Sequence, residues 1–381
     1  MSRLGPMARP VILILGGYGV FGRRIAANLA RHEEIDLVIA GRNPNAAATF
    51  VRSLGPSRAR SLAVDLARPD AISTLIAAKP AILVDTLGPF QVRNLALPRR
   101  CAERGIHYID IADASARVVD IASLDAVARV EHAAVISGAS TVPALTTAVV
   151  DELVPNAREV VAIDVGITPG QRTPRGMATV RAILGYCGKP IPSVCGDEAI
   201  YGWGDLTRHA YPEPVGERWL SNVDTPERAL WRARYPALED ASIRAGLAIG
   251  VLHLGLSGLS RGVRLGVLPS LERFAKPLNR VADFFDRVGT DAGAMHVRVT
   301  ARDAHARTTS RTATLVAENG DGPQVPAAPA AVLVKKLLGL RGYAPLATRG
   351  AFPCVGILTR EEILHELRDF DVRFEVDRQG R

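Results

Sequence analysis

The first part of the chain alternates short apolar runs with segments of helical periodicity. Val11–Leu15 is a continuous apolar run, and after a glycine-rich turn the positions Ile25 and Leu29 recur at helical spacing. Further strands are expected at Leu37–Ala40, Ser61–Val64, Ala81–Val84, His107–Ile111 and Ala133–Ile136, with helices between them that include Pro44–Leu54 and Asp70–Ala78. Strands separated by helices of this length predict a doubly wound parallel sheet, which we place at residues 9–150.

The regular alternation of strands and helices changes from about Val160 onward. Polar stretches become longer, and strand-like alternation in His296–Thr300 and Ala313–Ala317 indicates an antiparallel sheet. We therefore expect a second, mixed α/β (α+β) domain at residues 151–325, within an overall α/β fold class.

The C-terminal segment, residues 326–381, contains two expected helices. Ala328–Leu340 has a helical pattern, and Thr359–Glu362 is a capping box that opens a helix to Leu367. This segment is expected to pack back on the first domain.

Composition indicates a folded protein with more than one core. The chain has 381 residues, of which 48% are hydrophobic and 23% charged. The net charge of +8 comes mostly from arginine, but no run of like charges marks a nucleic-acid arm, so nucleic acid is not an expected partner. The four cysteines lack metal-ligand spacing and the N-terminus lacks a signal-peptide pattern. We therefore expect a cytoplasmic protein with no metal site and no disulfide framework.

One stretch, Ala245–Ser260, contains no formal charge and carries His253. Several basic residues follow it, namely Arg261, Arg264, Arg273, Lys276 and Arg280. The stretch is shorter than a bilayer span, which favours a buried helix or a dimer contact over a membrane surface. Binding of this stretch to a membrane surface is the less favoured alternative.

The segment after the first predicted strand fits the G-x-G-x-x-G pattern between a buried strand and a helix, as Gly17-Tyr18-Gly19-Val20-Phe21-Gly22. Gly17 permits the tight turn, Gly19 lets the backbone approach a pyrophosphate, and Gly22 lets the helix lie close to the strand. The free N–H groups at the start of the helix then face the phosphates. Residues 17–21 are thus predicted to bind a dinucleotide in a Rossmann domain.

The residue at the end of the second strand distinguishes the two nicotinamide cofactors. NAD is recognised there by an acidic residue, whereas this chain has Ala40-Gly41-Arg42-Asn43. Arg42 can pair with the 2′-phosphate of NADP(H), so NADP(H) is the predicted cofactor, with Arg42 and Asn43 as candidate binding residues. A solvated surface arginine is the alternative. Asp65 either accepts a hydrogen bond from the adenine amino group or caps a turn, and Asn43 can also cap the helix that begins at Pro44.

The loop after the fourth strand, Val84–Gln91, follows at the carboxyl edge of the sheet, where a nicotinamide would pass. Thr86, Gly88 and Pro89 are therefore candidate cofactor neighbours. A purely structural Gly-Pro turn is the competing interpretation.

These motifs, in this order, resemble the saccharopine dehydrogenase-like reductases. The resemblance covers about residues 9–150 and rests on Gly16–Gly22, Ala40–Asn43, Asp65, Asp85–Phe90, Cys101 and Gly105–Asp110. It implies an NADP-binding Rossmann domain followed by a substrate domain that often dimerises, so a homodimer is expected. In related proteins an acidic residue occupies the place of Asp113, which could orient substrate, relay a proton or cap a helix. The family includes amino-acid, polyamine and lipid-linked reductases, so the resemblance does not fix the substrate.

The expected function is that of an NADP(H)-dependent oxidoreductase. It would transfer hydride between the nicotinamide and a C=N, C=O or activated C=C bond of a small molecule, with Asp113 as the candidate catalytic residue. Two alternatives remain from the sequence. One is a non-catalytic NADP(H)-binding redox sensor, and the other is a peripheral membrane reductase of a lipid-linked substrate.

Overall fold

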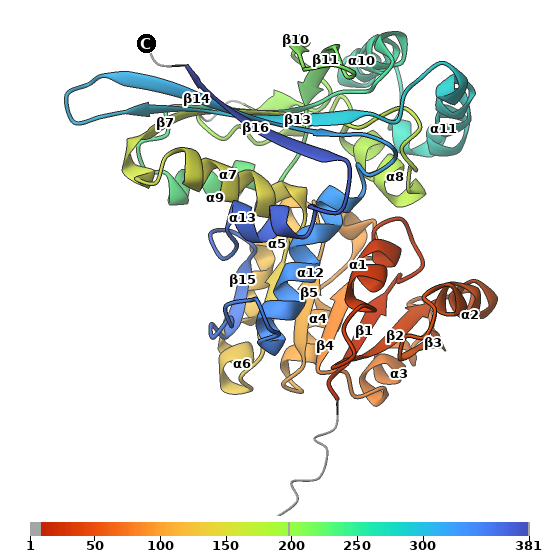
Figure 1. Cartoon of the computed structure of the whole chain (residues 1–381). Helices are drawn as coiled ribbons and strands as arrows, with labels where there is room; N and C mark the ends of the chain where they lie inside the picture. Colours follow the sequence, from red (N-terminus) through yellow and green to blue (C-terminus); the bar gives the residue numbers. More distant parts are fainter. Residues whose placement is uncertain (1–8, 197–198, 380–381) are drawn as a thin grey trace, which may run out of the picture.

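The computed structural model describes residues 9–196 and 199–379, which form two sheets with their covering helices (Figure 1). The first sheet has seven strands in the order β15-β6-β5-β4-β1-β2-β3. In chain order they are β1 (Val11–Leu15), β2 (Asp36–Gly41), β3 (Ala59–Ala63), β4 (Ile82–Asp85), β5 (His107–Asp110), β6 (Ala134–Ser137) and β15 (Gly350–Pro353). All neighbouring strands are parallel, which confirms the predicted doubly wound sheet.

Helices cover both faces of this sheet, and its central strands are therefore buried on both sides. The helices are α1 (Gly22–Leu29), α2 (Pro44–Ser53), α3 (Ala71–Ala77), α4 (Ala96–Ala102), α5 (Ser115–Asp120), α6 (Asp125–Val130) and α12 (Gln324–Leu338). The apolar run of β1 is buried from Ile12 to Leu15. β1 and β4 are the point at which the strand order reverses, and ligands of such sheets bind at the carboxyl ends of the strands there.

The second sheet is mixed, in the order β10-β11-β12-β7-β13-β14-β16. Its strands are β7 (Val160–Thr168), β10 (Thr207–Ala210), β11 (Glu217–Asn222), β12 (Asp240–Ala245), β13 (Gly293–Arg302), β14 (Thr308–Ala317) and β16 (Val372–Gln379). The long β13–β14 hairpin is antiparallel, as its alternation predicts, whereas β7 and β12 run parallel. A small separate sheet joins β8 (Pro190–Ile191) to β9 (Ile200–Tyr201).

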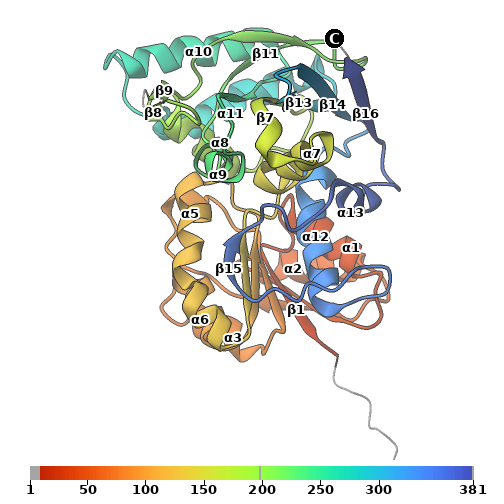
Figure 2. The same ribbon diagram turned by 90° about the vertical axis from the view of Figure 1, so that its left-hand side faces the viewer.

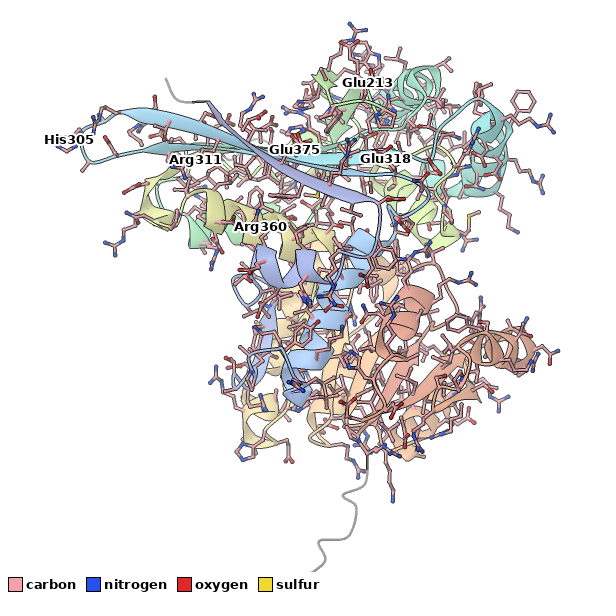
Figure 3. The ribbon with its side chains drawn as sticks, viewed as in Figure 1. Glu213, His305, Arg311, Glu318, Arg360 and Glu375 are labelled. Carbon is pink, nitrogen blue, oxygen red and sulfur yellow. The ribbon has the colours of Figure 1, made fainter. Side chains whose placement is uncertain are left out.

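The helices of this half are α7 (Thr146–Leu153), α8 (Met177–Tyr186), α9 (Glu227–Arg234), α10 (Gly250–Arg264) and α11 (Ala275–Phe284). Figure 2 shows α7 and α9 between the two sheets, with α10 on the far side of the second sheet. Arg311 of β14 donates to the carbonyl of Leu153 at 2.7 Å, and Arg360 pairs with Glu152 at 2.6 Å (Figure 3). The first contact joins the end of α7 to the second sheet, and the second joins it to the helix that begins at Arg360.

The C-terminal segment contributes to both sheets. β15 extends the first sheet beside β6, and β16 extends the second beside β14. Between them lies α13 (Arg360–His365), whose Thr359–Glu362 capping box forms as predicted. Buried Lys335 of α12 pairs with Glu366 at 2.6 Å, and Asn28 of α1 donates to the same carboxylate at 2.6 Å. The segment is thereby fixed to the first domain.

Candidate functional site

A tight glycine turn joins β1 to α1. Gly16 has φ +78 and donates its N–H to the carbonyl of Ala40 at 2.8 Å. A Cβ on Gly22 would lie 2.3 Å from the carbonyl oxygen of Gly16 and 2.8 Å from the Cα of Gly17, so only glycine lets the helix approach the strand. α1 begins without a side-chain cap. The N–H groups of Arg23 and Arg24 already donate to the carbonyls of Gly19 and Phe21 at 3.2 and 3.0 Å, whereas those of Val20 and Phe21, just before the helix, have no acceptor among the described residues and are available to a phosphate.

The end of β2 forms the second part of the site. The Tyr18 hydroxyl accepts a hydrogen bond from the backbone N–H of Asn43 at 2.9 Å, and its ring lies against Gly41, where a Cβ would be 2.5 Å from a ring carbon. The side chain of Asn43 caps α2 through the N–H of Ala46 at 3.0 Å. Arg42 is exposed and forms no hydrogen bond or ion pair within residues 9–196 and 199–379. Its guanidinium is therefore available to an anion.

A cavity of about 270 Å³ runs from the glycine turn to the second domain. Nine of the predicted residues line it, namely Tyr18, Gly19, Val20, Phe21, Arg42, Thr86, Gly88, Pro89 and Asp113. Gly17, Asn43 and Asp65 are not among the lining residues. Asp65 instead accepts a hydrogen bond from the N–H of Ala67 at 3.1 Å, which is the turn-capping alternative.

Sequence reasoning missed the far wall of this cavity. Gly176 and the first turns of α8 form it, through Met177, Ala178, Thr179 and Ala182. These residues belong to no motif, and only the packing of the second domain against the strand ends brings them to the cofactor loops. Gln91 and Ile111 line the cavity as well, and no signal in the sequence distinguishes them from ordinary loop residues.

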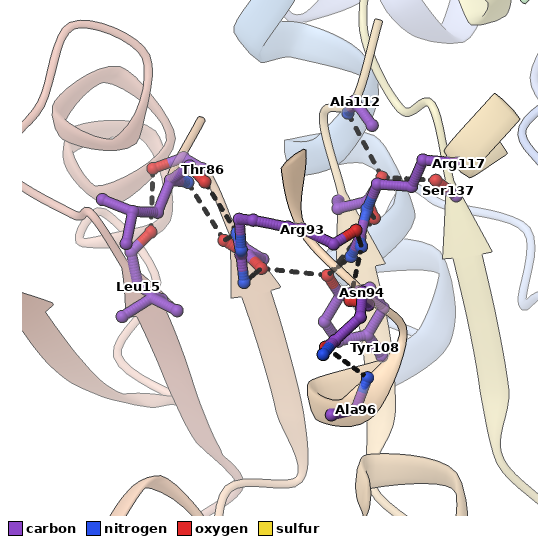
Figure 4. A network of polar contacts seen from close by, with 12 residues as sticks. Leu15, Thr86, Arg93, Asn94, Ala96, Tyr108, Ala112, Arg117 and Ser137 are labelled. Carbon is purple, nitrogen blue, oxygen red and sulfur yellow. Dashed lines mark hydrogen bonds and ion pairs between the residues drawn. The ribbon is translucent and has the colours of Figure 1, made fainter. Parts of the chain in front are cut away.

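A buried polar network lies behind the loop after β4 (Figure 4). Asp85 and Asp110, at the ends of β4 and β5, are fully buried. Asp85 pairs with Arg93 at 2.7 Å, and Asp110 pairs with Arg117 at 3.1 Å. The hydroxyl of Tyr108 joins the two pairs, because it donates to Asp85 at 3.0 Å and accepts from Arg117 at 2.8 Å.

Both arginines of this network also hold the loop itself. Arg93 donates to the carbonyl of Leu87 at 2.6 Å, and Arg117 donates to the carbonyl of Asn94 at 2.9 Å. Burial alone would lower the pKa of Arg93, but the charge and hydrogen bond of Asp85 outweigh burial and raise it. Both guanidinium groups stay charged, and the loop that carries Thr86 is fixed at the carboxyl edge of the sheet.

The two aspartates after β5 have different surroundings. Asp110 accepts hydrogen bonds from Ser137 at 2.6 Å and from the N–H of Gly138 at 3.1 Å, so its role is structural. Asp113 faces the cavity and accepts one from Gln91 at 3.3 Å. It does not cap α5, whose N-cap is Ala114. Burial raises the pKa of Asp113, and the charge of Asp110 adds to this increase.

Tyr186 of α8 is not among the residues that line the cavity. Tyr186 follows Thr179 and Ala182 on one side of α8, at helical spacing. Burial raises its pKa well above the usual value, and the charges of Asp113 and Asp224 add to the effect. A protonated phenol therefore lies within electrostatic reach of Asp113.

The strand order, the glycine turn and the cavity define a dinucleotide-binding protein of the Rossmann class. Residues 12–149 match the family model described as the saccharopine dehydrogenase NADP binding domain. This match confirms the predicted resemblance and NADP(H) as the cofactor. The protein is accordingly placed among oxidoreductases.

The first of two similar solved structures supports the same fold. Apo saccharopine dehydrogenase (L-Glu forming) from Saccharomyces cerevisiae is similar with a TM-score of 0.64 and 13% identity, over 97% of this chain and 100% of that one. Amine dehydrogenase from Mycobacterium smegmatis is similar with a TM-score of 0.46 and 10% identity, over 93% and 96%. No curated protein sequence matches the chain. Within the described residues, no helix is both long and apolar enough to cross a membrane.

Proposed function

We propose that the protein transfers hydride between NADP(H) and a C=N, C=O or activated C=C bond of a small molecule. The observation that carries the proposal is the continuous cavity from the glycine turn and Arg42, past the loop after β4, to Asp113 and α8. A dinucleotide bound along this path would present its nicotinamide between the strand ends and the second domain. The bound cofactor supplies the hydride chemistry, and the protein supplies binding, orientation and exclusion of water.

Each part of the cavity has a role in this proposal. The uncapped start of α1 binds the pyrophosphate, and Arg42 pairs with the 2′-phosphate. The loop that holds Thr86 and Gly88 positions the nicotinamide. Its fixed geometry comes from Arg93 and Arg117 behind it.

Asp113 is the proposed proton donor or substrate-orienting group. Burial raises the pKa of Asp113 above that of an exposed aspartate, which is the direction that favours a general acid. The small and apolar side chains of α8, Met177, Ala178 and Ala182, would cover the substrate on the opposite side. Such a wall excludes water from the reacting carbon.

The first test is calorimetric titration of the purified protein with NADPH and NADH. We expect NADPH to bind more tightly, and Arg42→Ala to reduce NADPH affinity by about tenfold or more with little effect on NADH, because a charge-assisted contact to the 2′-phosphate is lost. Arg104→Ala, an exposed arginine remote from the cavity, is the matched control. Equal affinity for both cofactors in the wild type would contradict the assignment of Arg42.

The second test is turnover of NADPH with panels of imines, ketones and enoyl compounds. With a substrate found, Asp113→Asn is expected to lower kcat while NADPH affinity stays unchanged. Tight NADPH binding without turnover on any panel would instead favour the redox-sensor alternative.

A further inference from the structure

Helix α10 directs its uncharged polar side chains inward. His253 is fully buried, accepts a hydrogen bond from the N–H of Leu247 at 3.2 Å and lies 3.0 Å from the hydroxyl of Ser221. Ser257 and Ser260 are buried too, and donate to carbonyl oxygens of the loop after β9 at 3.3 and 2.9 Å. The inward side of the helix therefore combines these hydrogen bonds with apolar packing of Leu256, Leu259 and Val263 against the core.

The outward side of α10 is apolar. Val251 is 63% exposed and Leu254 is 42% exposed, although both are large aliphatic side chains. A Cβ on Gly255 or Gly258 would have no neighbour within 4 Å, so nothing in the described residues covers this side. A helix on the surface of a water-soluble domain normally has the opposite arrangement. Of the predicted possibilities, burial within this chain is therefore wrong for the outward side, and the dimer contact and the membrane surface stay untested.

The apolar exposure continues along the chain into α11. Of the twelve large apolar side chains exposed in the described residues, eight lie in this one region, namely Val251, Leu254, Leu265, Val267, Phe274, Val281, Phe284 and Val288. Scattered exposed apolar residues are ordinary, but such a concentration marks an interaction surface. We call the exposed side chains of residues 251–288 the α10–α11 surface.

The charges of the α10–α11 surface are predominantly positive. Six exposed basic residues lie on it, namely Arg261, Arg264, Arg273, Lys276, Arg280 and Arg287. None of the six forms an ion pair in the part of the chain that the structure describes. Of its three acidic residues, Asp283 and Asp286 are both paired with Arg175, at 2.8 and 2.6 Å. Counted with Arg175, seven cations stand against three carboxylates, so the net charge of this region is positive. The natural complement of this surface is apolar and anionic.

We propose that the α10–α11 surface docks on an anionic lipid membrane. Its valine, leucine and phenylalanine side chains would enter the boundary between headgroups and acyl chains, and its arginines would lie among the lipid phosphates. A second copy of the chain fits less well, because a two-fold contact would place the same unpaired cations on both sides. The glycines of α10 leave the helix backbone free to lie close to the bilayer surface.

The α10–α11 surface is close to the cavity. α8, whose first turns line the cavity, packs against α11 and against the short helix Leu271–Phe274 that precedes it. Figures 1 and 2 show α8 beside α11 in both views. A membrane-bound protein would therefore hold its proposed active site one helix away from the lipid. The docking itself does not depend on the proposed reaction and is tested without it.

The test is flotation of the full-length protein with vesicles of phosphatidylcholine, alone or mixed with phosphatidylglycerol. We expect the protein to float with the mixed vesicles, to stay behind with phosphatidylcholine alone, and to dissociate as salt is raised. The paired change Val251→Ser and Phe284→Ser, and separately Arg280→Glu, should each weaken binding by about tenfold or more.

Matched controls separate the surface from general effects of substitution. Val130→Ser replaces a valine that is 73% exposed on α6, and Arg104→Glu reverses an exposed charge far from the α10–α11 surface. Both should bind vesicles like the wild type, and all variants should keep wild-type affinity for NADPH, which reports folding. No flotation with either vesicle, or equal losses in the controls, would overturn the proposal. A lipid-independent dimer that Phe284→Ser dissociates would overturn it in favour of a second copy.

Discussion

The buried pair of Asp85 and Arg93 gives a prediction whose size follows from the structure. Arg93→Met removes the cation from a carboxylate that is fully buried, and breaking such a pair typically costs about 3–5 kcal/mol. Asp85 keeps hydrogen bonds from the hydroxyl of Tyr108 and the N–H of Leu87, and the Arg93 side chain is itself 17% exposed. We therefore expect Arg93→Met to lower the free energy of unfolding by about 3 kcal/mol, at the lower end of that range.

Urea denaturation followed by circular dichroism measures this loss, provided that the substitution leaves unchanged the slope of unfolding free energy against urea concentration. Arg100→Met is the matched control, because Arg100 pairs with Glu103 at 3.1 Å on the surface, and should cost less than about 1 kcal/mol. The double variant Arg93→Met with Asp85→Asn should be more stable than Arg93→Met alone, since the second change removes the unpaired charge.

Two results would refute this reasoning. The first is a loss for Arg93→Met as small as that for Arg100→Met, which would mean that Asp85 is solvated or that another cation replaces Arg93. The second is a double variant less stable than the single one, which would mean that the carboxylate of Asp85 stabilises the loop without its partner.

Two further predictions concern other parts of the molecule. Gly22→Ala should weaken NADPH binding by about tenfold or more, because the new Cβ would force α1 away from Gly16. The circular dichroism spectrum should stay unchanged, and an unaltered NADPH affinity by calorimetry would contradict the prediction. Burial alone would raise the pKa of Asp164, but hydrogen bonds from His296 and Ser242 outweigh burial and hold the pKa below its usual value. The wild type should therefore be more stable than Asp164→Asn by its full margin above about pH 4, and this margin should shrink as the pH falls further. Urea midpoints of both proteins across that range measure the difference, and a constant difference would count against the assigned partners.

The elements that the sequence predicted well are those whose cause is local. The strand Val11–Leu15, the glycine turn and α1 follow each other within about twenty residues, and each is dictated by apolar runs or by glycine. The capping box at Thr359 and the cap at Asn43 also depend on residues only three positions apart. These features needed no knowledge of the rest of the chain.

The far wall of the cavity and the network behind it were decided by contacts between distant segments. Arg117 reaches Asn94 and Tyr108 only because adjacent strands of the sheet end at the same edge. Met177 of α8 lines the cavity only because the second domain packs over that edge. A sequence pattern describes one segment at a time, so neither relation was visible in it.

The sequence by itself determined the fold of the dinucleotide-binding half, because apolar runs and turn glycines act over a few residues. Only the tertiary structure decided that β15 joins the first sheet and β16 the second, since strand pairing depends on which edge is free. It also decided which side of α10 is buried. Burial is set by the neighbours that cover a side chain and not by its polarity, so His253 lies inside while Val251 faces out.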